Sequence, residues 1–240
     1  MNRIGSRLLT VASRFCGPPG IANGGYVCGL ISTALARVVT VRLNRPVPLE
    51  RPLELVATGD EQWQLQEHGQ AVALVRAATL SLEVPTPPDY VEALDASVHY
   101  RGFQQHPYPG CFVCGPARDR GDGLRLFASS LSNRPLAAAA WLPDASLAGD
   151  DGKVAPEFLS AALDCPGFFA LTDAPPGAWL LGEFTAHVDR SVHVDEPCVV
   201  IGWRLGSDGR KHTVGTALFD EDGELAAYAR GVWIAPREAG

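Results

Sequence analysis

A chain of 240 residues, 46% of them hydrophobic and 20% charged, has the composition of an ordinary globular protein and the length for one large domain or two small ones. Its formal net charge of −7 argues against an extended nucleic-acid-binding surface. No apolar run reaches 18 residues and the N-terminus lacks the apolar core of a signal peptide, so no membrane-spanning helix and no signal peptide are expected. Four of the six cysteines stand alone in apolar contexts, which favours reduced thiols in a cytoplasmic protein.

The first half of the chain predicts one buried helix among strands. A strand is expected over Leu8–Phe15, and the turn-rich loop Cys16–Gly25 follows it. Tyr26–Val38 is almost free of charge, which is typical of a helix that is buried on all sides. The strands expected after this helix are rich in β-branched residues and cover Val39–Leu43, Leu53–Thr58 and Val72–Leu82.

The middle of the chain separates this half from a second one. Glu83–Gly123 contains six prolines and shows little periodicity, which predicts a connector. We therefore expect an N-terminal unit over residues 1–84, a proline-rich connector with a CxxC motif over 85–122, and a C-terminal unit over 123–240. The strands expected in the C-terminal unit are Leu124–Ser130, Leu136–Leu142, Leu180–Val188, Cys198–Leu205, Thr213–Asp220 and Leu225–Ile234.

One stretch of the C-terminal unit combines an apolar helix with a carboxylate. Pro156–Ala170 reads PEFLSAALDCPGFFA and predicts a single helix without a polar face, which is buried on all sides. Asp164 lies in its middle, and burying an unpaired carboxylate is costly. Pro166, two residues later, cannot donate to the helix and crowds the carbonyl four residues before it. We interpret Asp164 as the chemical centre of the protein.

The two halves also predict an internal repeat. Residues 39–55 align without a gap on residues 184–200, at an offset of 145. A later segment aligns Gly69 with Gly223 and Arg76 with Arg230. Because both segments stand in the same order after a buried helix, the two halves are expected to have the same fold. The identical pairs in the first segment are Thr40 with Thr185, Arg45 with Arg190, Val47 with Val192, and Pro52 with Pro197.

This plan resembles the hotdog fold, in which a glycine-rich loop precedes a long, nearly uncharged helix and antiparallel strands follow. Two copies in one chain resemble the double-hotdog acyl-CoA thioesterases of the thioesterase superfamily. The segment CFVCGP at 111–116, followed by GLRL at 123–126, is similar to an opening often seen in such proteins. The resemblance implies an α+β double hotdog, with two tandem units that each wrap an antiparallel sheet around a long buried helix. It also implies an acyl-CoA or related thioester as substrate, without a cofactor or metal.

The resemblance places parts of a site on both helices. In one thioesterase group of this fold, the helix begins with His-Gly-Gly and carries an Asp or Glu nine positions after the His. The first half has the loop, as Asn23–Gly25, but Ser32 at the acid position. The second half has the acid, Asp164, but residues 155–157 replace its loop.

These incomplete sets suggest one composite site. Nine residues of helix rise about 13 Å, so a loop and an acid on the same helix cannot serve one small site. In hotdog dimers, each site is similarly built from one unit's loop and its partner's acid. The resemblance therefore implies one complete site, made by Asn23–Gly25 and Asp164, and one that has lost its function.

The chemistry of thioester hydrolysis assigns the roles. Backbone N–H groups of Gly24 and Gly25 at a helix N-terminus are expected to hold the carbonyl oxygen. Asn23, in place of a histidine, can bind substrate or orient water but cannot act as a base. Asp164 is expected to activate a water or to attack the thioester. The full set of expected site residues is Asp164, Asn23, Gly24 and Gly25 as catalytic groups, and Tyr26 and Ser160 as substrate contacts.

Other functions and structural roles stay open at this point. A catalytically silent acyl-thioester or lipid binder would bind without turnover, and a hotdog dehydratase or hydratase would need a histidine where Asn23 stands. A purely structural or assembly role, and a homodimer of such chains, also remain open. Taken singly, Asn23–Gly25 is typical of a turn with a helix N-cap, and Asp164 of a carboxylate bonded to backbone groups that Pro166 leaves free.

The CxxC motif in the connector has three interpretations. Cys111 and Cys114 suit zinc, but zinc normally takes four ligands, and the spacing of His99 and His106 fits no standard zinc finger. A redox pair is the second possibility. A packing turn of the loop is favoured, and no metal is predicted.

Overall fold

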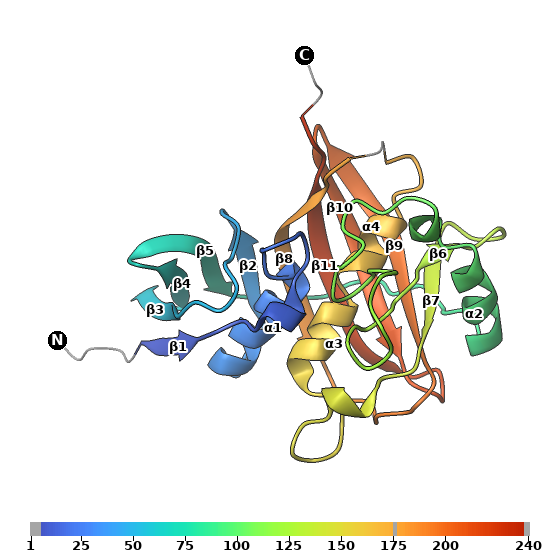
Figure 1. Cartoon of the computed structure of the whole chain (residues 1–240), viewed down its shortest axis with the longest axis horizontal. Helices are drawn as coiled ribbons and strands as arrows, with labels where there is room; N and C mark the ends of the chain where they lie inside the picture. Colours follow the sequence, from blue (N-terminus) through green and yellow to red (C-terminus); the bar gives the residue numbers. More distant parts are fainter. Residues whose placement is uncertain (1–5, 175–176, 238–240) are drawn as a thin grey trace.

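The computed structural model describes residues 6–174 and 177–237, which form an α+β structure (Figure 1). The α-helices within these ranges are α1 (Gly24–Leu35), α2 (Tyr90–Val98), α3 (Pro156–Ala162) and α4 (Cys165–Phe169). The described strands are β1 (Arg7–Leu9), β2 (Val39–Leu43), β3 (Leu53–Gly59), β4 (Gln62–Glu67), β5 (Gln70–Ala77), β6 (Ser129–Ser130), β7 (Ala137–Trp141), β8 (Leu180–Val188), β9 (Cys198–Asp208), β10 (Lys211–Phe219) and β11 (Leu225–Ile234). None of the helices in these ranges has the length and apolar character needed to cross a membrane.

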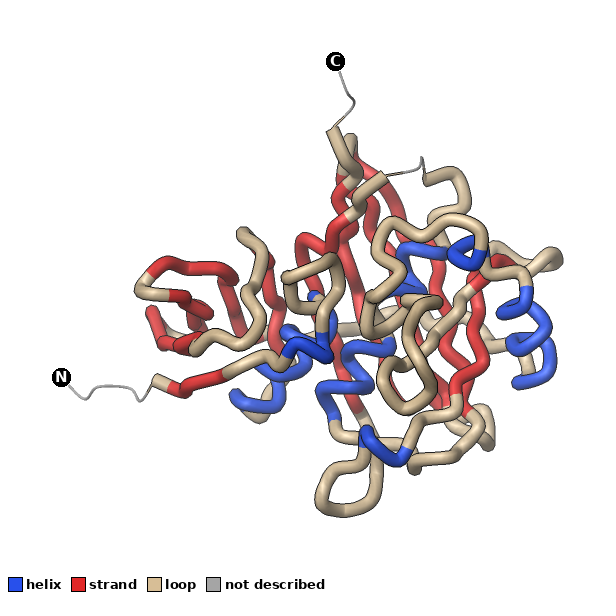
Figure 2. Tube along the Cα trace, in the orientation of Figure 1, coloured by secondary structure: helices blue, strands red, loops and turns tan. Residues whose placement is uncertain are grey.

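The strands make one large antiparallel sheet, which curves around α1, α3 and α4 (Figure 2). Its order is β1-β3-β4-β5-β2-β8-β11-β10-β9-β7-β6, so strands of the first half lie together, as do those of the second. The halves join where β2 pairs with β8. The predicted bounds of Val39–Leu43, Leu180–Val188 and Leu225–Ile234 agree with the bounds of β2, β8 and β11.

The junction between β2 and β8 is symmetric in sequence. Thr40 lies directly opposite Thr185, its partner in the sequence alignment, and their buried hydroxyl oxygens are 2.8 Å apart. On the outer sides of this pair, Thr40 is paired with Arg76 on β5, and Thr185 is paired with Arg230 on β11. Equivalent residues of the two halves therefore stand at equal distances from the junction.

The helices α1 and α3 lie against each other beside this junction (Figure 1). Asn23 begins α1 as its N-cap, because its side chain accepts a hydrogen bond from the backbone N–H of Tyr26. Gly25 and Gly29, one helical turn apart, face α3. A Cβ added to Gly25 would lie 2.6 Å from the Cβ of Asp164, and one added to Gly29 would lie 2.7 Å from the Cα of Glu157. Only glycine permits this close approach of the two helices.

The helix predicted over Pro156–Ala170 is in fact two helices. α3 ends at Ala162 and α4 begins at Cys165, with Asp164 between them at φ −78° and ψ −79°. Pro166 explains the break, since it has no N–H for the Ala162 carbonyl and its ring crowds that carbonyl. Asp164 thus lies at a helix interruption rather than in the middle of a helix.

Other parts of the sequence prediction need correction. The strand predicted over Leu8–Phe15 is only β1, followed by a 3₁₀ turn over Ser13–Phe15. The predicted connector contains α2, which Asp89 caps through the N–H of Glu92, so proline content alone was misleading there. The sequence analysis also missed β4, and it made the strands that correspond to β5 and β6 too long at one end.

Two hydrophobic clusters fill the space around the sheet. The larger one includes α1, α3 and the inner residues of the strands. The smaller one lies between α2 and the other face of the sheet, where Ala93 and Ala96 of the helix pack with Ile201 and Trp203 of β9. Because β9 is covered on both faces, it is hydrophobic almost without alternation from Cys198 to Trp203.

Candidate functional site

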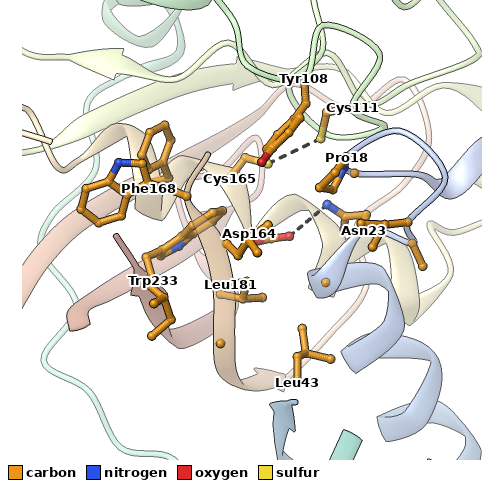
Figure 3. Close-up of a pocket in the computed structure, with 18 of the residues that line it drawn as sticks. Pro18, Asn23, Leu43, Tyr108, Cys111, Asp164, Cys165, Phe168, Leu181 and Trp233 are labelled. Carbon is orange, nitrogen blue, oxygen red and sulfur yellow. Dashed lines mark hydrogen bonds between the residues drawn. The ribbon is translucent and has the colours of Figure 1, made fainter. Parts of the chain in front are cut away.

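The N-terminus of α1 meets the break between α3 and α4 at Asp164 (Figure 3). The side-chain amide of Asn23 donates a 3.0 Å hydrogen bond to Asp164 Oδ2, and the backbone N–H of Gly25 donates one of 2.9 Å to the same oxygen. Asn23 Oδ1 meanwhile accepts from the N–H of Tyr26, so the amide of this one residue caps the helix and holds the carboxylate. Groups from the two halves of the chain, 141 positions apart, form one hydrogen-bonded unit.

The second carboxylate oxygen of Asp164 is different. The residue is only 2% exposed, and within the described part of the chain Oδ1 is one of three buried side-chain polar atoms without a hydrogen-bond partner. Burial raises the pKa of Asp164 to about 7. The hydrogen bonds from Gly25 and Asn23 oppose this rise, and the nearby Cys111 adds to it. Near neutral pH the charged and the protonated forms are both populated. A buried carboxylate oxygen that lacks a protein partner is available to a bound water or ligand.

A pocket of about 280 Å³ opens beside this carboxylate. Asn23, Gly24 and Asp164 are among the residues that contribute polar groups to it, and Figure 3 shows Asn23 and Asp164 pointing toward one another. An apolar wall with a few convergent polar groups is typical of a small-molecule site. The apolar residues lining the pocket include Pro18, Ile21, Leu43, Phe168, Leu181 and Trp233, which come from both halves of the chain.

The structure distinguishes the two glycines that the sequence analysis grouped together. The N–H of Gly25 is already bonded to Asp164. The N–H of Gly24, the first of α1, has no acceptor among the described residues, and Gly24 lines the pocket. Of these two donors, Gly24 is the one that is open to a ligand.

Tyr26 and Ser160, the expected substrate contacts, are not among the residues that line the pocket. Tyr26 stacks on Phe15 with ring centroids 4.1 Å apart and contacts Phe112 and Phe158. Ser160 is buried in α3, where a Cβ added to Gly29 would lie 2.7 Å from the Ser160 Cβ. Both residues support the packing of the two helices behind the site.

The second combination would join the acid position of α1, residue 32, with the loop position of α3, residues 155–157. It contains no comparable pair. Ser32 on α1 donates its hydroxyl to the backbone carbonyl of Arg37, past the C-terminal end of the helix. Ala155 is the N-cap of α3 without a side-chain hydrogen bond. Neither position offers a buried carboxylate beside a free helix N-terminus.

The sequence analysis missed a cluster of three thiols. Cys165, which follows Asp164 directly, lies beside Cys111 and Cys114 of the CxxC motif, and the three sulfur atoms are all within 4.8 Å of one another. Hydrogen bonds from the thiols of Cys114 and Cys165 hold the pKa of Cys111 well below its usual value. The position of Cys165 next to the site aspartate was the only sequence signal, because 54 residues separate it from Cys111.

Comparison with known proteins shows the fold. No protein-family model and no curated sequence matches the chain. A tesB protein of Mycobacterium avium subsp. paratuberculosis is similar in structure, with a TM-score of 0.62 and 13% identity over 98% of this chain and 96% of that one. The acyl-CoA thioesterase II of Mycobacterium marinum has a TM-score of 0.59 and 14% identity over 98% of this chain and 94% of that one.

A third similar structure is described as a hotdog fold. A conserved protein of unknown function with a hotdog fold, from Alicyclobacillus acidocaldarius, has a TM-score of 0.55 and 10% identity over 98% of this chain and 94% of that one. The chain thus shares the hotdog fold with these solved structures over almost its full length.

Proposed function

We propose that this protein hydrolyses the thioester bond of an acyl-CoA or a related acyl thioester. The observation that carries the proposal is the buried carboxylate of Asp164, which two donors from the N-terminal end of α1 hold through one oxygen while its other oxygen is unpaired. A base with a pKa near neutrality, beside an apolar pocket and a free helix N-terminus, suits this reaction. The fold shared with thioesterase II-like structures supports the same assignment.

The scaffold that we propose is a tandem double hotdog. Residues 1–84 and 123–240 would each be one unit, and residues 85–122 the connector between them. The pairing of β2 with β8 through Thr40 and Thr185, which are equivalent in the sequence alignment, supports this arrangement. So does the contact of α1 with α3, since each is the first α-helix of its proposed unit.

The proposed reaction uses Asp164 Oδ1 as the base. A water in the pocket loses a proton to Oδ1 while its oxygen forms a bond to the thioester carbon. The carbonyl oxygen, which gains negative charge, accepts a hydrogen bond from the N–H of Gly24 at the positive end of α1. The carbon–sulfur bond then breaks, the carboxylic acid is released, and the proton on Oδ1 passes to the leaving thiolate.

Asn23 and Gly25 position the base in this scheme. Both bond to Oδ2, so the carboxylate cannot rotate without losing two hydrogen bonds. This arrangement fixes the orientation of Oδ1 and leaves this oxygen free to accept a proton from the water. Tyr26 and Ser160 pack behind the site, and we assign them no contact with the reacting atoms.

Basic side chains near the pocket favour an anionic leaving group such as CoA. Arg45 lines the pocket itself. A more polar hollow adjoins it and shares Leu43 and Ile234 with it, and Arg42 and Lys211 are among the residues around this hollow. Glu183 and Asp208 also line this hollow, so in this proposal the phosphate groups of a CoA moiety bind at Arg42, Lys211 and Arg45 rather than across the whole hollow.

The test is release of free thiol from short, medium, long and aromatic acyl-CoAs, measured together with equilibrium binding of each compound. Turnover of at least one acyl-CoA is the expected result, and it would also give the acyl preference. The second candidate function is a catalytically silent acyl-thioester binder. The two hydrogen bonds to Asp164 Oδ2 favour it, because they are also what a purely structural carboxylate needs. Binding of acyl-CoA without thiol release would support the binder and refute the hydrolase.

A further inference from the structure

Three buried cysteines from two distant parts of the chain meet beside the pocket. Cys111 and Cys114 belong to the loop after α2, and Cys165 is the first residue of α4. All three line the pocket, and each is at most 5% exposed. Figure 3 shows Cys111 and Cys165 facing each other, and their sulfur atoms are 3.9 Å apart. The proposed hydrolysis uses none of these thiols.

The spacing of the sulfur atoms suits a metal ion. All three lie within 4.8 Å of one another and are not bonded to each other. In a tetrahedral zinc site with Zn–S bonds of about 2.3 Å, neighbouring sulfur atoms are about 3.8 Å apart. The cluster is therefore close to the geometry of three corners of a zinc tetrahedron.

The loop that carries two of the thiols is built as a tight turn. The N–H of Gly115 donates a 2.9 Å hydrogen bond to the carbonyl of Cys111. A Cβ added to Gly115 would lie 2.4 Å from the carbonyl oxygen of Pro109 and 2.6 Å from the nitrogen of Cys111, so the turn requires glycine.

His106 adjoins the cluster as a hydrogen-bond donor. Its Nε2 lies 3.4 Å from the sulfur of Cys114, while its Nδ1 accepts a 2.9 Å hydrogen bond from the backbone N–H of Tyr108. Because Nδ1 is an acceptor, the ring proton of a neutral His106 is on Nε2 and points at the sulfur. A histidine in this tautomer does not ligate a metal through Nε2, but it stabilises the neighbouring thiolate.

We propose that Cys111, Cys114 and Cys165 bind one zinc ion through their three sulfur atoms, with the fourth coordination position facing the pocket. Thiolates are soft ligands that select zinc among the common divalent ions, and binding would release the thiol protons. A water from the pocket would complete the tetrahedron. The ion would tie the CxxC loop to the start of α4, and so fix the wall of the pocket next to Asp164. This replaces the sequence-based expectation that no metal is bound.

The experiment is metal analysis of the full chain, purified without a chelator or a metal-binding tag. We expect about one zinc per chain in the wild type, measured by inductively coupled plasma mass spectrometry. Cys111→Ser, Cys114→Ser and Cys165→Ser should each lose at least about 80% of this zinc, since three ligands are needed to hold it. Matched controls are Cys28→Ser and Cys198→Ser, whose buried thiols lie outside the cluster and whose zinc content should be unchanged.

A second measurement covers variants that fail to fold. Zinc is removed from the wild type with a chelator and replaced by Co²⁺, for which thiolate ligands give intense near-ultraviolet absorption and tetrahedral geometry gives strong visible bands. We expect both spectral features to saturate at about one equivalent of Co²⁺. His106→Gln should keep its zinc, and loss to the level of the cysteine variants would overturn the three-thiolate assignment.

Other results would refute the site altogether. A wild-type protein that is purified without zinc and gives no Co²⁺ spectrum would do so, as would a disulfide between two of the three cysteines in that protein. Equal zinc loss in the control variants would also refute it. None of these readouts measures hydrolysis, so the zinc site and the proposed function can fail independently.

Discussion

At the scale of single residues, the site depends on the different surroundings of the two carboxylate oxygens of Asp164. Asp164 uses Oδ2 for Asn23 and Gly25 and keeps Oδ1 free. The resemblance to hotdog dimers implied that the loop before the first helix would meet this acid, and helix geometry excluded only a site built from a loop and an acid nine residues apart on one helix. Neither could predict that Gly25 would bind the acid itself, or that Cys165 would join the CxxC motif. Those contacts depend on the helix break at Pro166 and on the fold of the CxxC loop.

Asn23 should show separate effects on stability and on catalysis. Asn23→Ala removes the N-cap and one donor to Asp164, so we expect a loss of about 1 kcal/mol in the free energy of unfolding. We also expect a fall of roughly tenfold or more in kcat/KM. Asn23→Ser is the matched variant, since serine caps a helix well but cannot reach Asp164 with an amide. It should recover most of the stability and little of the activity; recovery of both would show that Asn23 acts only as a cap.

At the scale of elements, the packing of α1 on α3 positions the site. The lack of a polar face predicted that both helices are buried. The abundance of β-branched residues predicted the strands. The sequence analysis missed α2, since the prolines around that helix hid a nine-residue element with an ordinary Asp cap. It also joined α3 and α4, because their shared apolar character outweighed the single signal of Pro166.

Gly29 tests this packing directly. Gly29→Ala places a methyl group 2.7 Å from the Cα of Glu157, so the two helices must separate. We expect a loss of about 1–3 kcal/mol in the free energy of unfolding, measured by denaturant titration. Gly206→Ala on β9 is the control, since a Cβ there meets nothing within 4 Å, and its change should stay within about 0.5 kcal/mol. Equal effects of the two substitutions would contradict the close approach of α1 and α3.

At the scale of the whole molecule, the two halves share one sheet and one site. The sequence alignment paired Thr40 with Thr185, and the structure brings these two residues together at the junction of β2 and β8. Sequence alone could indicate that the halves are related, but not which strands would meet. This pairing covers one edge of each half-sheet, at β2 and at β8, and the helices α1 and α3, which lie beside it, bring Asp164 to the N-terminus of α1.

The threonine pair at the junction makes a testable prediction. Thr40→Val or Thr185→Val leaves one buried hydroxyl without its partner, so each should lower the free energy of unfolding by about 1–2 kcal/mol. The double variant removes both hydroxyls and should cost clearly less than the two single costs added together. Additive costs, measured by denaturant titration, would show that the hydrogen bond across the junction contributes nothing.

The central claim is that Asp164 is the base for thioester hydrolysis, and one comparison of rates tests it. Asp164→Asn keeps an oxygen that can accept from Asn23 and Gly25, so the fold should be retained, as judged by circular dichroism and the unfolding midpoint. We expect kcat/KM for the best acyl-CoA to fall by at least about 100-fold, since a general base contributes about 10²–10⁴ in rate. A folded variant that hydrolyses the substrate as fast as the wild type would contradict the account and make Asp164 a structural residue.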